Sequence, residues 1–353
     1  MNDAGIGAAL APRPLDSTRD NSGSASVAIV VLNWNGRDDT IECLESLRRL
    51  EYPRFGVVVV DNGSTDGSVA AIKGRFPEVV VLETGANLGY AGGNNVGIKW
   101  ALAKTAEYIL LLNNDTVVAR DMLSELVSAA ATVPEGSVIG PPIFYYDKPD
   151  RLCFLGARWS NEYGGFRYEG GGKQLEHGVP RIREVDYVNG CALMAGRSVF
   201  EEVGQLDEAF FLTYEETDWC YRARRHGHRC FVATSAKVWH KVSASFGGAK
   251  SPLIVYFMTR NKLLWARKHL PVSQRIRLHL AAVRDALQLF APPLPLRQAW
   301  PPTPRRLLWL GASWVRQRGD RLRDPGNRAF LRGLFDYYRR KFGDCPPELR
   351  RPR

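Results

Sequence analysis

Four hydrophobic segments in the first third of the chain each lead into a polar residue, and a stretch with helical periodicity follows each one. The segments span residues 27–33, 55–61, 79–83 and 108–115. The polar residues are Asn33, Asp61, Asn87 and Asp115, which are 28, 26 and 28 positions apart. Four strand–helix units of this length predict a parallel, doubly wound α/β sheet. Because ligands bind beyond the carboxyl ends of parallel strands, we expect the four polar residues to line one ligand site.

The glycine motifs that bind phosphates in many nucleotide-binding proteins are missing. The chain contains neither GxxxxGK[ST] nor GxGxxG, and the glycines of GYAGGNN (89–95) have a different spacing. This argues against a P-loop NTPase and against a dinucleotide-binding fold. A nucleotide bound at this sheet would have to be held by strand-end side chains and a metal ion.

The positive charge of the chain is concentrated near its C-terminal end. The sequence has 48 Lys and Arg against 37 Asp and Glu, whereas residues 301–353 alone have 14 against 5. A nucleic-acid enzyme would spread its basic groups over a working face, so this distribution favours an anionic membrane surface and no nucleic acid. An apolar stripe flanked by basic residues predicts that the last helix lies on that surface; packing of the helix back on the catalytic domain is the alternative. The stripe consists of Phe330, Leu334, Tyr338 and Phe342.

Composition divides the chain into three expected regions. Residues 1–26 form a disordered leader without the features of a signal peptide, 27–270 an α/β domain, and 271–353 a basic, amphipathic helical region. The six cysteines form no CxxC pair, which fits a reducing compartment. No apolar run approaches the ~20 residues that span a bilayer. We therefore expect a cytoplasmic protein that associates peripherally with the inner face of the membrane.

Three carboxylates, Glu215, Glu216 and Asp218, lie within four positions. Acidic residues in a first helical turn stabilise the helix dipole, which is the structural explanation of this cluster. Three acids so close together also repel one another and raise the pKa of at least one of them. A carboxylate with a raised pKa is suited to act as a general base.

A candidate metal site lies at the end of the fourth segment. Asp115 follows Asn113 and Asn114 there, and carboxylates at such a position can ligate Mg²⁺ or Mn²⁺ together with substrate phosphates. His240 ends a later predicted strand, 229–240, and is either a structural histidine or a second ligand.

An ordered series of motifs resembles the family 2 glycosyltransferases with a GT-A fold, most of all the non-processive branch that contains rhamnosyltransferases. The similar segments include VVLNWNG, VVVVDNGSTDGS, ANLGYAGGNNVGI, LLLNNDT, NGCALMAGRSVFEEVGQLDEAFFLTYEETDWCYRARRHG and TRNKLLWARKH, between residues 27 and 269. The resemblance implies that the α/β domain is a GT-A domain. The QxxRW motif of the processive synthases is missing, so we expect the addition of one or a few sugars.

The resemblance also implies roles for individual residues. The nucleotide and sugar donor would be held by Asn33, Asp61, Asn87, Gly89, Asn94, Asn113, Asn114 and Arg260. Asn113–Asp115 stands where the family has its DXD metal motif, with Asn113 in place of the first acid. Asp115 is thus the remaining carboxylate ligand, and His240 matches a further ligand position. Trp219 and Asn261 are assigned to the acceptor.

Glu216 matches the position of the family's catalytic base, with Asp218 and Glu215 as neighbouring alternatives. The expected reaction is an inverting, metal-dependent transfer of a sugar from dTDP-rhamnose, the favoured donor, or from a UDP-sugar. The acceptor would be a hydroxyl of a glycan or of a lipid-linked sugar used in cell-surface polysaccharide or glycolipid synthesis.

Two other functions fit an α/β sheet with acidic strand ends. A sugar-phosphate nucleotidyltransferase would need a basic, glycine-rich loop after its first strand, and residues 33–36 (NWNG) are not such a loop. A non-catalytic module that binds glycans or nucleotide sugars would be consistent with the replacement of the first DXD acid.

Overall fold

The computed structural model describes residues 24–160, 165–176, 178–242, 251–290 and 303–350. The chain divides into two compact units, Met1–Ser245 and Phe246–Arg353. The second unit begins at Phe246, before the boundary at residue 271 expected from composition. Most of the leader predicted for residues 1–26 lies outside the described residues.

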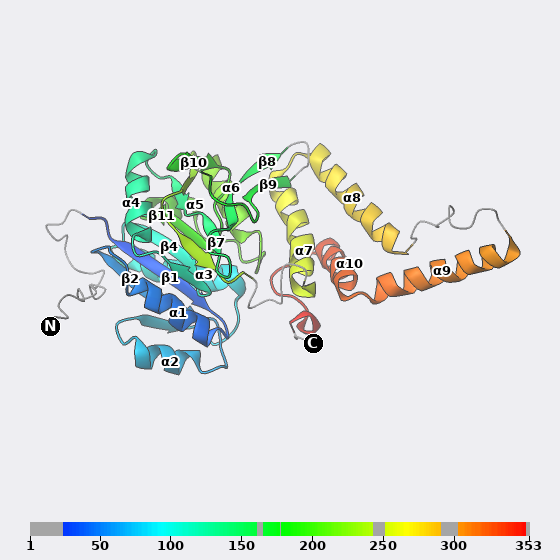
Figure 1. The fold of residues 1–353 in the computed structure, drawn as a ribbon, viewed down its shortest axis with the longest axis horizontal. Coiled ribbons are helices and arrows are strands. Elements are labelled where there is room, and N and C mark those ends of the chain that lie inside the picture. The colour runs from blue at the N-terminus through cyan, green and yellow to red at the C-terminus, as the bar shows by residue number, and fades with distance from the viewer. Residues whose placement is uncertain (1–23, 161–164, 177, 243–250, 291–302, 351–353) are drawn as a thin grey trace. The chain divides into compact units, whose positions relative to one another are not determined.

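The first unit is built on an eight-stranded sheet (Figure 1). Its order is β10 (Ile182–Val185), β12 (Cys230–Ala233), β6 (Val138–Gly140), β11 (Ala192–Gly196), β4 (Tyr108–Asn113), β1 (Val27–Asn33), β2 (Phe55–Asp61) and β3 (Val80–Glu83). The four predicted strands are parallel to one another, whereas β11 is antiparallel to β4. The sheet is therefore mixed, and the parallel sheet expected from the sequence makes up one side of it.

The side chains of β1 explain why it is central. Val27–Val31 have no exposed surface, as expected for a strand covered on both faces. Among the described residues of this unit, six helices accompany the strands: α1 (Arg37–Leu47), α2 (Ser68–Arg75), α3 (Gly89–Ala103), α4 (Met122–Thr132), α5 (Arg197–Val203) and α6 (Glu215–Arg225). Helix α3 lies so close to β1 that a Cβ atom at Gly97 would overlap the side chain of Val30.

A second sheet positions the later part of the chain. Its order is β5 (Thr116–Val118), β13 (Val238–His240), β7 (Ile143–Tyr145), β8 (Leu152–Ser160) and β9 (Gly165–Gly170). The single strand predicted for residues 229–240 is wrong, because the chain turns after Ala233. Strand β12 joins the large sheet and β13 joins the small one, where it brings His240 opposite Thr116.

The second unit is helical and contains α7 (Pro252–His269), α8 (Val272–Phe290), α9 (Pro304–Arg323), α10 (Pro325–Tyr338) and a short 3-10 turn, Pro347–Leu349. Helices α7 and α10 lie side by side (Figure 1). A Cβ atom at Gly333 would be 2.8 Å from the carbonyl oxygen of Tyr256, which shows how closely the two helices approach. None of the helices in the described ranges is long and apolar enough to cross a membrane.

This packing corrects the expectation for the last helix. Leu334 is buried and Phe330 is half-buried, so the predicted apolar stripe does not form one exposed face. The hydroxyl group of Tyr256 on α7 donates a hydrogen bond to the buried Asp336 of α10, at 2.9 Å. Helix α10 is therefore packed on α7 within the C-terminal unit, whereas the alternative considered for it was packing on the catalytic domain.

Candidate active site

The carboxyl ends of β1 and β2 meet in a buried hydrogen-bond network. The amide Nδ2 of Asn33 donates to Oδ2 of Asp61 at 2.8 Å and to the hydroxyl of Ser64 at 3.1 Å. Its Oδ1 accepts hydrogen bonds from Thr40 and Asn114, at 2.8 and 3.2 Å. Asn33 thus uses both of its donors and its acceptor inside the protein, and it orients Asp61 rather than offering its own amide to a ligand.

The loop after β3 is fixed by a residue that the sequence analysis missed. Asn62 donates to the side-chain oxygen of Asn87 at 3.2 Å and to the carbonyl of Gly89 at 3.0 Å. Asn87 in turn accepts from the backbone N–H of Gly89 at 2.8 Å. The position of Asn62 directly after Asp61, at the end of the same strand, could have identified it as a candidate from the sequence.

The start of α3 interlocks with the turn that precedes α6. Gly89 has a φ of +74°, and a Cβ atom there would be 2.5 Å from the carbonyl oxygen of Phe211. The next residue, Tyr90, donates its backbone N–H to that same carbonyl at 2.6 Å. Asn94, one turn along α3, is buried and keeps its Oδ1 without a hydrogen-bond partner among the described residues. These contacts connect the expected donor pocket with the acidic cluster.

Asp115 and His240 are brought together by the pairing of β5 with β13. Oδ1 of Asp115 lies 3.0 Å from Nε2 of His240, and Nδ2 of Asn113 lies 3.4 Å from the same nitrogen. Burial opposes the charged form of His240, but Cys191 and Asp115 favour it, and the pKa of the imidazole lies well above its ordinary value.

This pair has the chemistry of a metal site that is completed by substrate. One carboxylate and one imidazole fit Mn²⁺ or Mg²⁺, which commonly take their remaining ligands from water and diphosphate oxygens. Within the described ranges there is no group of three or more His, Cys, Asp or Glu residues placed to hold an ion. The residues fit a shared protein–substrate site and do not make a complete protein cage.

The loop 189–191 links this pair to the acidic cluster. The carbonyl of Cys191 accepts a hydrogen bond from the backbone N–H of Asn113 at 2.9 Å. On the other side, a Cβ atom at Gly190 would be 3.3 Å from Cβ of Glu216, and the hydroxyl of Tyr90 donates to the Gly190 carbonyl. The expected metal ligands and the expected base therefore flank one loop.

The acidic cluster begins α6 and is strongly desolvated. Burial raises the pKa of Glu216, while burial and the neighbouring carboxylates of Glu216 and Asp218 raise the pKa of Glu215 well above its ordinary value. Glu216 is half-buried, and its Oε2 has no hydrogen-bond partner among the described residues. A buried carboxylate oxygen without a partner and with raised proton affinity is suited to receive a proton from a bound hydroxyl group.

The turn before α6 is held in an uncommon conformation. Phe211, Thr213 and Tyr214 have φ angles of +64°, +67° and +74°. Non-glycine residues with such angles cost on the order of 1 kcal/mol each and cluster at functional sites. Here they place the acidic residues at the first turn of α6.

Asp218 and Trp219 have contacts that differ from those expected of catalytic or acceptor residues. Asp218 has no exposed surface and forms an ion pair with Arg222 at 2.8 Å. Arg222 also donates to the carbonyls of Val203 and Gln205. Trp219 is fully buried, stacks on Phe200 with ring centroids 4.7 Å apart, and donates to a backbone carbonyl. Both residues therefore stabilise the packing of α6, and the assignment of Trp219 to the acceptor does not agree with its burial.

Arg260 and Asn261 lie on α7 in the second unit. Both are fully buried, and Nε of Arg260 donates to Oδ1 of Asn261 at 3.0 Å. Arg260 also donates to the hydroxyl of Tyr256 at 3.3 Å. These contacts give the two side chains a structural role within that unit, and the donor and acceptor roles expected for them stay predictions.

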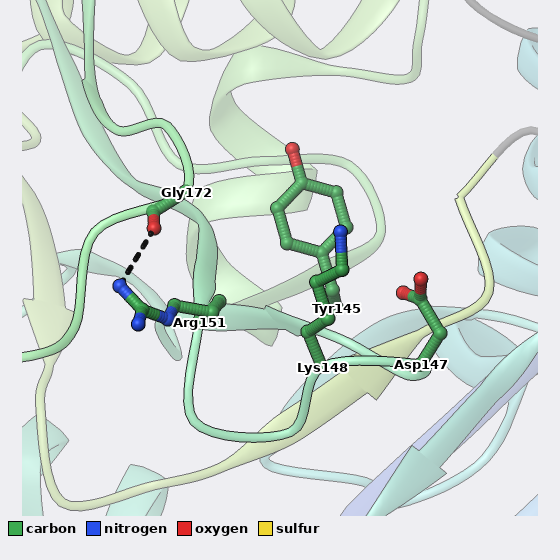
Figure 2. Close-up of a pocket in the computed structure, with 5 residues that line it drawn as sticks. All are labelled: Tyr145, Asp147, Lys148, Arg151 and Gly172. Atoms are coloured by element: carbon green, nitrogen blue, oxygen red, sulfur yellow. Dashed lines mark hydrogen bonds between the residues drawn. The ribbon is translucent and has the colours of Figure 1, made fainter.

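A surface hollow of ≈ 470 Å³ lies on the small sheet (Figure 2). It is lined by Tyr145, Asp147, Lys148, Arg151 and Gly172. In Figure 2 the guanidinium of Arg151 reaches the Gly172 carbonyl, at 3.5 Å. Tyr145 is the Cα partner of His240 in the pairing of β7 with β13, but neither Asp115 nor His240 lines the hollow.

Comparison with known proteins decides the family. The model of "Glycosyl transferase family 2" matches residues 26–203. The chain belongs to glycosyl transferase family 2. It is 28% identical over 250 residues to the low-salt glycan biosynthesis hexosyltransferase Agl10 of Haloferax volcanii, covering 67% of this chain and 74% of that protein. The enzyme is thus a glycosyltransferase and not a sugar-phosphate nucleotidyltransferase.

Other relatives in family 2 are rhamnosyltransferases. The N-acetylglucosaminyl-diphospho-decaprenol L-rhamnosyltransferase of Mycobacterium tuberculosis is 29% identical over 58% of this chain and 72% of its own. The dTDP-rhamnosyl transferase RfbF of Shigella flexneri is 26% identical over 72% and 84%. The mannosyltransferase PcManGT of Pyrobaculum calidifontis, solved with GDP-Man and Mn²⁺, covers 93% of this chain with a TM-score of 0.55 at 16% identity. This similarity shows that the fold is that of the GT-A glycosyltransferases.

Proposed function

We propose that this family 2 enzyme transfers a hexose, with rhamnose from dTDP-rhamnose favoured over a UDP-sugar, to a hydroxyl of a glycan or lipid-linked acceptor. The rhamnosyl and hexosyl activities of its relatives support the sugar class. The observation that carries the proposal is the position of Glu216, a desolvated carboxylate with an unpartnered oxygen. It lies on one side of the loop 189–191, and Asp115 and His240 lie on the other.

Each part of the site has one task in this proposal. Asp61, oriented by Asn33, binds the nucleotide, and the segment from Asn87 to Asn94, which includes the first turn of α3, lines the sugar pocket. Asp115 and His240 would hold the Mg²⁺ or Mn²⁺. A bound divalent ion there would supply Lewis-acid stabilisation of negative charge on the diphosphate.

The reaction is a single displacement. The acceptor oxygen forms a bond to the anomeric carbon while the bond from that carbon to the diphosphate oxygen breaks. The acceptor proton passes to the free Oε2 of Glu216, and the nucleoside diphosphate leaves with the bonding electron pair. One base and one displacement invert the configuration of the anomeric carbon.

We place the enzyme at the inner face of a membrane as a peripheral protein, as the basic C-terminal region favours. A lipid-linked acceptor would be found there.

Hydrolysis of donor sugars by the full chain tests the proposal without knowledge of the acceptor. With Mn²⁺ present, we expect slow release of dTDP from dTDP-rhamnose, faster than release of UDP from UDP-glucose, and loss of release with EDTA. A preference for a UDP-sugar would replace the favoured donor. No release from either class in any metal would contradict the proposed function.

A further inference from the structure

The outer side of α8 carries a continuous apolar stripe. It consists of Val272, Ile276, Leu280, Val283, Leu287 and Phe290, whose exposed fractions run from 41% to 65%. Spacings of three and four residues place all six within an arc of about 80° on a helix of 3.6 residues per turn. No residue of α8 is buried. A run of this size is uncommon on a free surface and marks a site of interaction.

The other side of α8 is already used within the C-terminal unit. His279, which borders the stripe, has its Nδ1 2.9 Å from the hydroxyl of Tyr338 on α10. Leu278, Ala282 and Leu289 on this side are half-buried. The exposed stripe therefore does not serve the packing of α8 on its neighbours in the unit.

Helix α9 approaches α8 near the C-terminal ends of both helices and adds apolar and basic side chains (Figure 1). There Arg321 of α9 donates to the carbonyl of Gln288 at 3.2 Å. Leu308 and Val315, two helical turns apart, are 76% and 64% exposed, and Trp309 is 52% exposed. Tryptophan combines an apolar ring with a polar N–H and is enriched at membrane–water interfaces.

Charge decides which partner fits this surface. Residues Val272–Phe290 and Pro304–Arg323 together contain nine arginines and two aspartates. Arg277 and Arg284 flank the stripe and are exposed. A second copy of the same face would bring like charges together, whereas anionic lipid headgroups would neutralise them and admit the apolar side chains below.

We infer that the stripe of α8, with the exposed residues of α9, is the surface by which the enzyme binds an anionic bilayer. The stripe would lie in the interfacial plane with its arginines at the level of the headgroups. The inference rests on the proposed function for its choice of a peripheral membrane location. It assigns that location to α8 and α9 in place of α10.

Flotation of the full chain with vesicles tests the inference. Wild-type protein should float with vesicles of phosphatidylcholine that contain about 30 mol% phosphatidylglycerol. With vesicles of pure phosphatidylcholine, the amount of floated protein should be at least tenfold lower. Leu280→Ser with Leu287→Ser should lower binding at least tenfold, because each side chain loses its apolar burial. Arg277→Gln with Arg284→Gln should lower it roughly thirtyfold in low salt and less in high salt.

The matched control removes two exposed apolar side chains outside the surface, Val80→Ser with Met258→Ser. This variant should float like the wild type. Circular dichroism melting of all variants shows whether they fold, and their donor hydrolysis shows whether the catalytic unit works. Equal flotation of the leucine variant and the wild type would overturn the inference. It would also be overturned if wild-type protein floated with neither kind of vesicle.

A second copy of the chain is the other possible occupant of this face. It would be indicated by a wild-type dimer that becomes monomeric in the leucine variant, without vesicle binding by the wild type. Absence of donor hydrolysis with normal flotation would contradict the proposed function alone.

Discussion

The carboxylates of Glu216 and Asp218 have different surroundings, although both lie in the first turn of α6. Asp218 is buried and paired with Arg222, whereas Glu216 keeps a free oxygen beside Gly190. The sequence places the three acids in one helical turn but cannot show which of them faces the loop, because that depends on the left-handed turn before the helix. The contacts favour Glu216 over Asp218 as the proposed base, a choice that the spacing leaves open.

Asp218→Asn should therefore lower stability more than activity. The change leaves Arg222 without its charged partner in a buried setting, which costs on the order of 3 kcal/mol. Thermal unfolding should show a lower Tm, and turnover per folded molecule at low temperature should stay within a few-fold of wild type. A folded Asp218→Asn protein without turnover would identify Asp218 as the base.

The raised pKa of Glu216 predicts a pH dependence of stability with a definite sign. Burial favours the protonated form in the folded state, so between the unfolded and folded pKa values the native protein binds more protons. Stability is then lost as pH rises through the folded pKa. Glu216→Gln should be more stable than wild type at pH 8 and closer to it at pH 4, measured by denaturant unfolding. Glu51→Gln, at an exposed position, is the control and should show no such difference. If the free energy of unfolding of Glu216→Gln changed with pH in the same way as that of wild type, the predicted contribution of Glu216 would be contradicted.

At the scale of elements, strand pairing brings together residues that are distant in the sequence. The ends of β1, β2 and β4 could be predicted because buried parallel strands have a strong pattern. The small sheet could not, since β5 and β13 have three residues each and their pairing depends on long-range contacts. As a result His240 could be singled out as a candidate, but its distance from Asp115 could not be derived.

Asp61 and Asp115, at the ends of two strands, are proposed to bind the nucleotide and the metal ion, so their loss should lower nucleotide affinity in two different ways. Asp61→Ala should weaken binding of dTDP with or without Mn²⁺, since Asp61 is assigned to the nucleotide. Asp115→Ala should remove chiefly the increase in affinity that Mn²⁺ gives. Titration calorimetry of dTDP in Mn²⁺ and in EDTA measures both. Equal losses for the two variants in both conditions would contradict separate roles.

The close packing at the start of α3 predicts that stability and donor affinity depend strongly on Gly89. Gly89→Ala would put a Cβ atom 2.5 Å from the Phe211 carbonyl at a φ of +74°, and should cost about 1–3 kcal/mol in stability together with donor affinity. Gly74→Ala in α2 is the matched control, because nothing lies within 4 Å of the new Cβ atom, and it should be neutral or slightly stabilising. Equal Tm values for the two variants would contradict the interlock of α3 with the turn before α6.

At the scale of the whole molecule, the chain divides its tasks between two units. The catalytic residues proposed here lie in the first unit, and the basic helices with the exposed stripe lie in the second. Net charge alone pointed to the C-terminal region as a membrane-binding element. It could not identify the helix, because the stripes of α8 and α10 look alike in sequence and only packing on α7 shows that α10 is occupied.

The central claim is that Glu216 takes the proton of the acceptor hydroxyl, and turnover of Glu216→Gln tests it most directly. The amide keeps the size of the side chain but cannot accept the proton. We predict a fall in kcat of about 10²–10⁴ with a donor Kd within about twofold of wild type. A folded Glu216→Gln enzyme with the kcat of wild type would contradict the account.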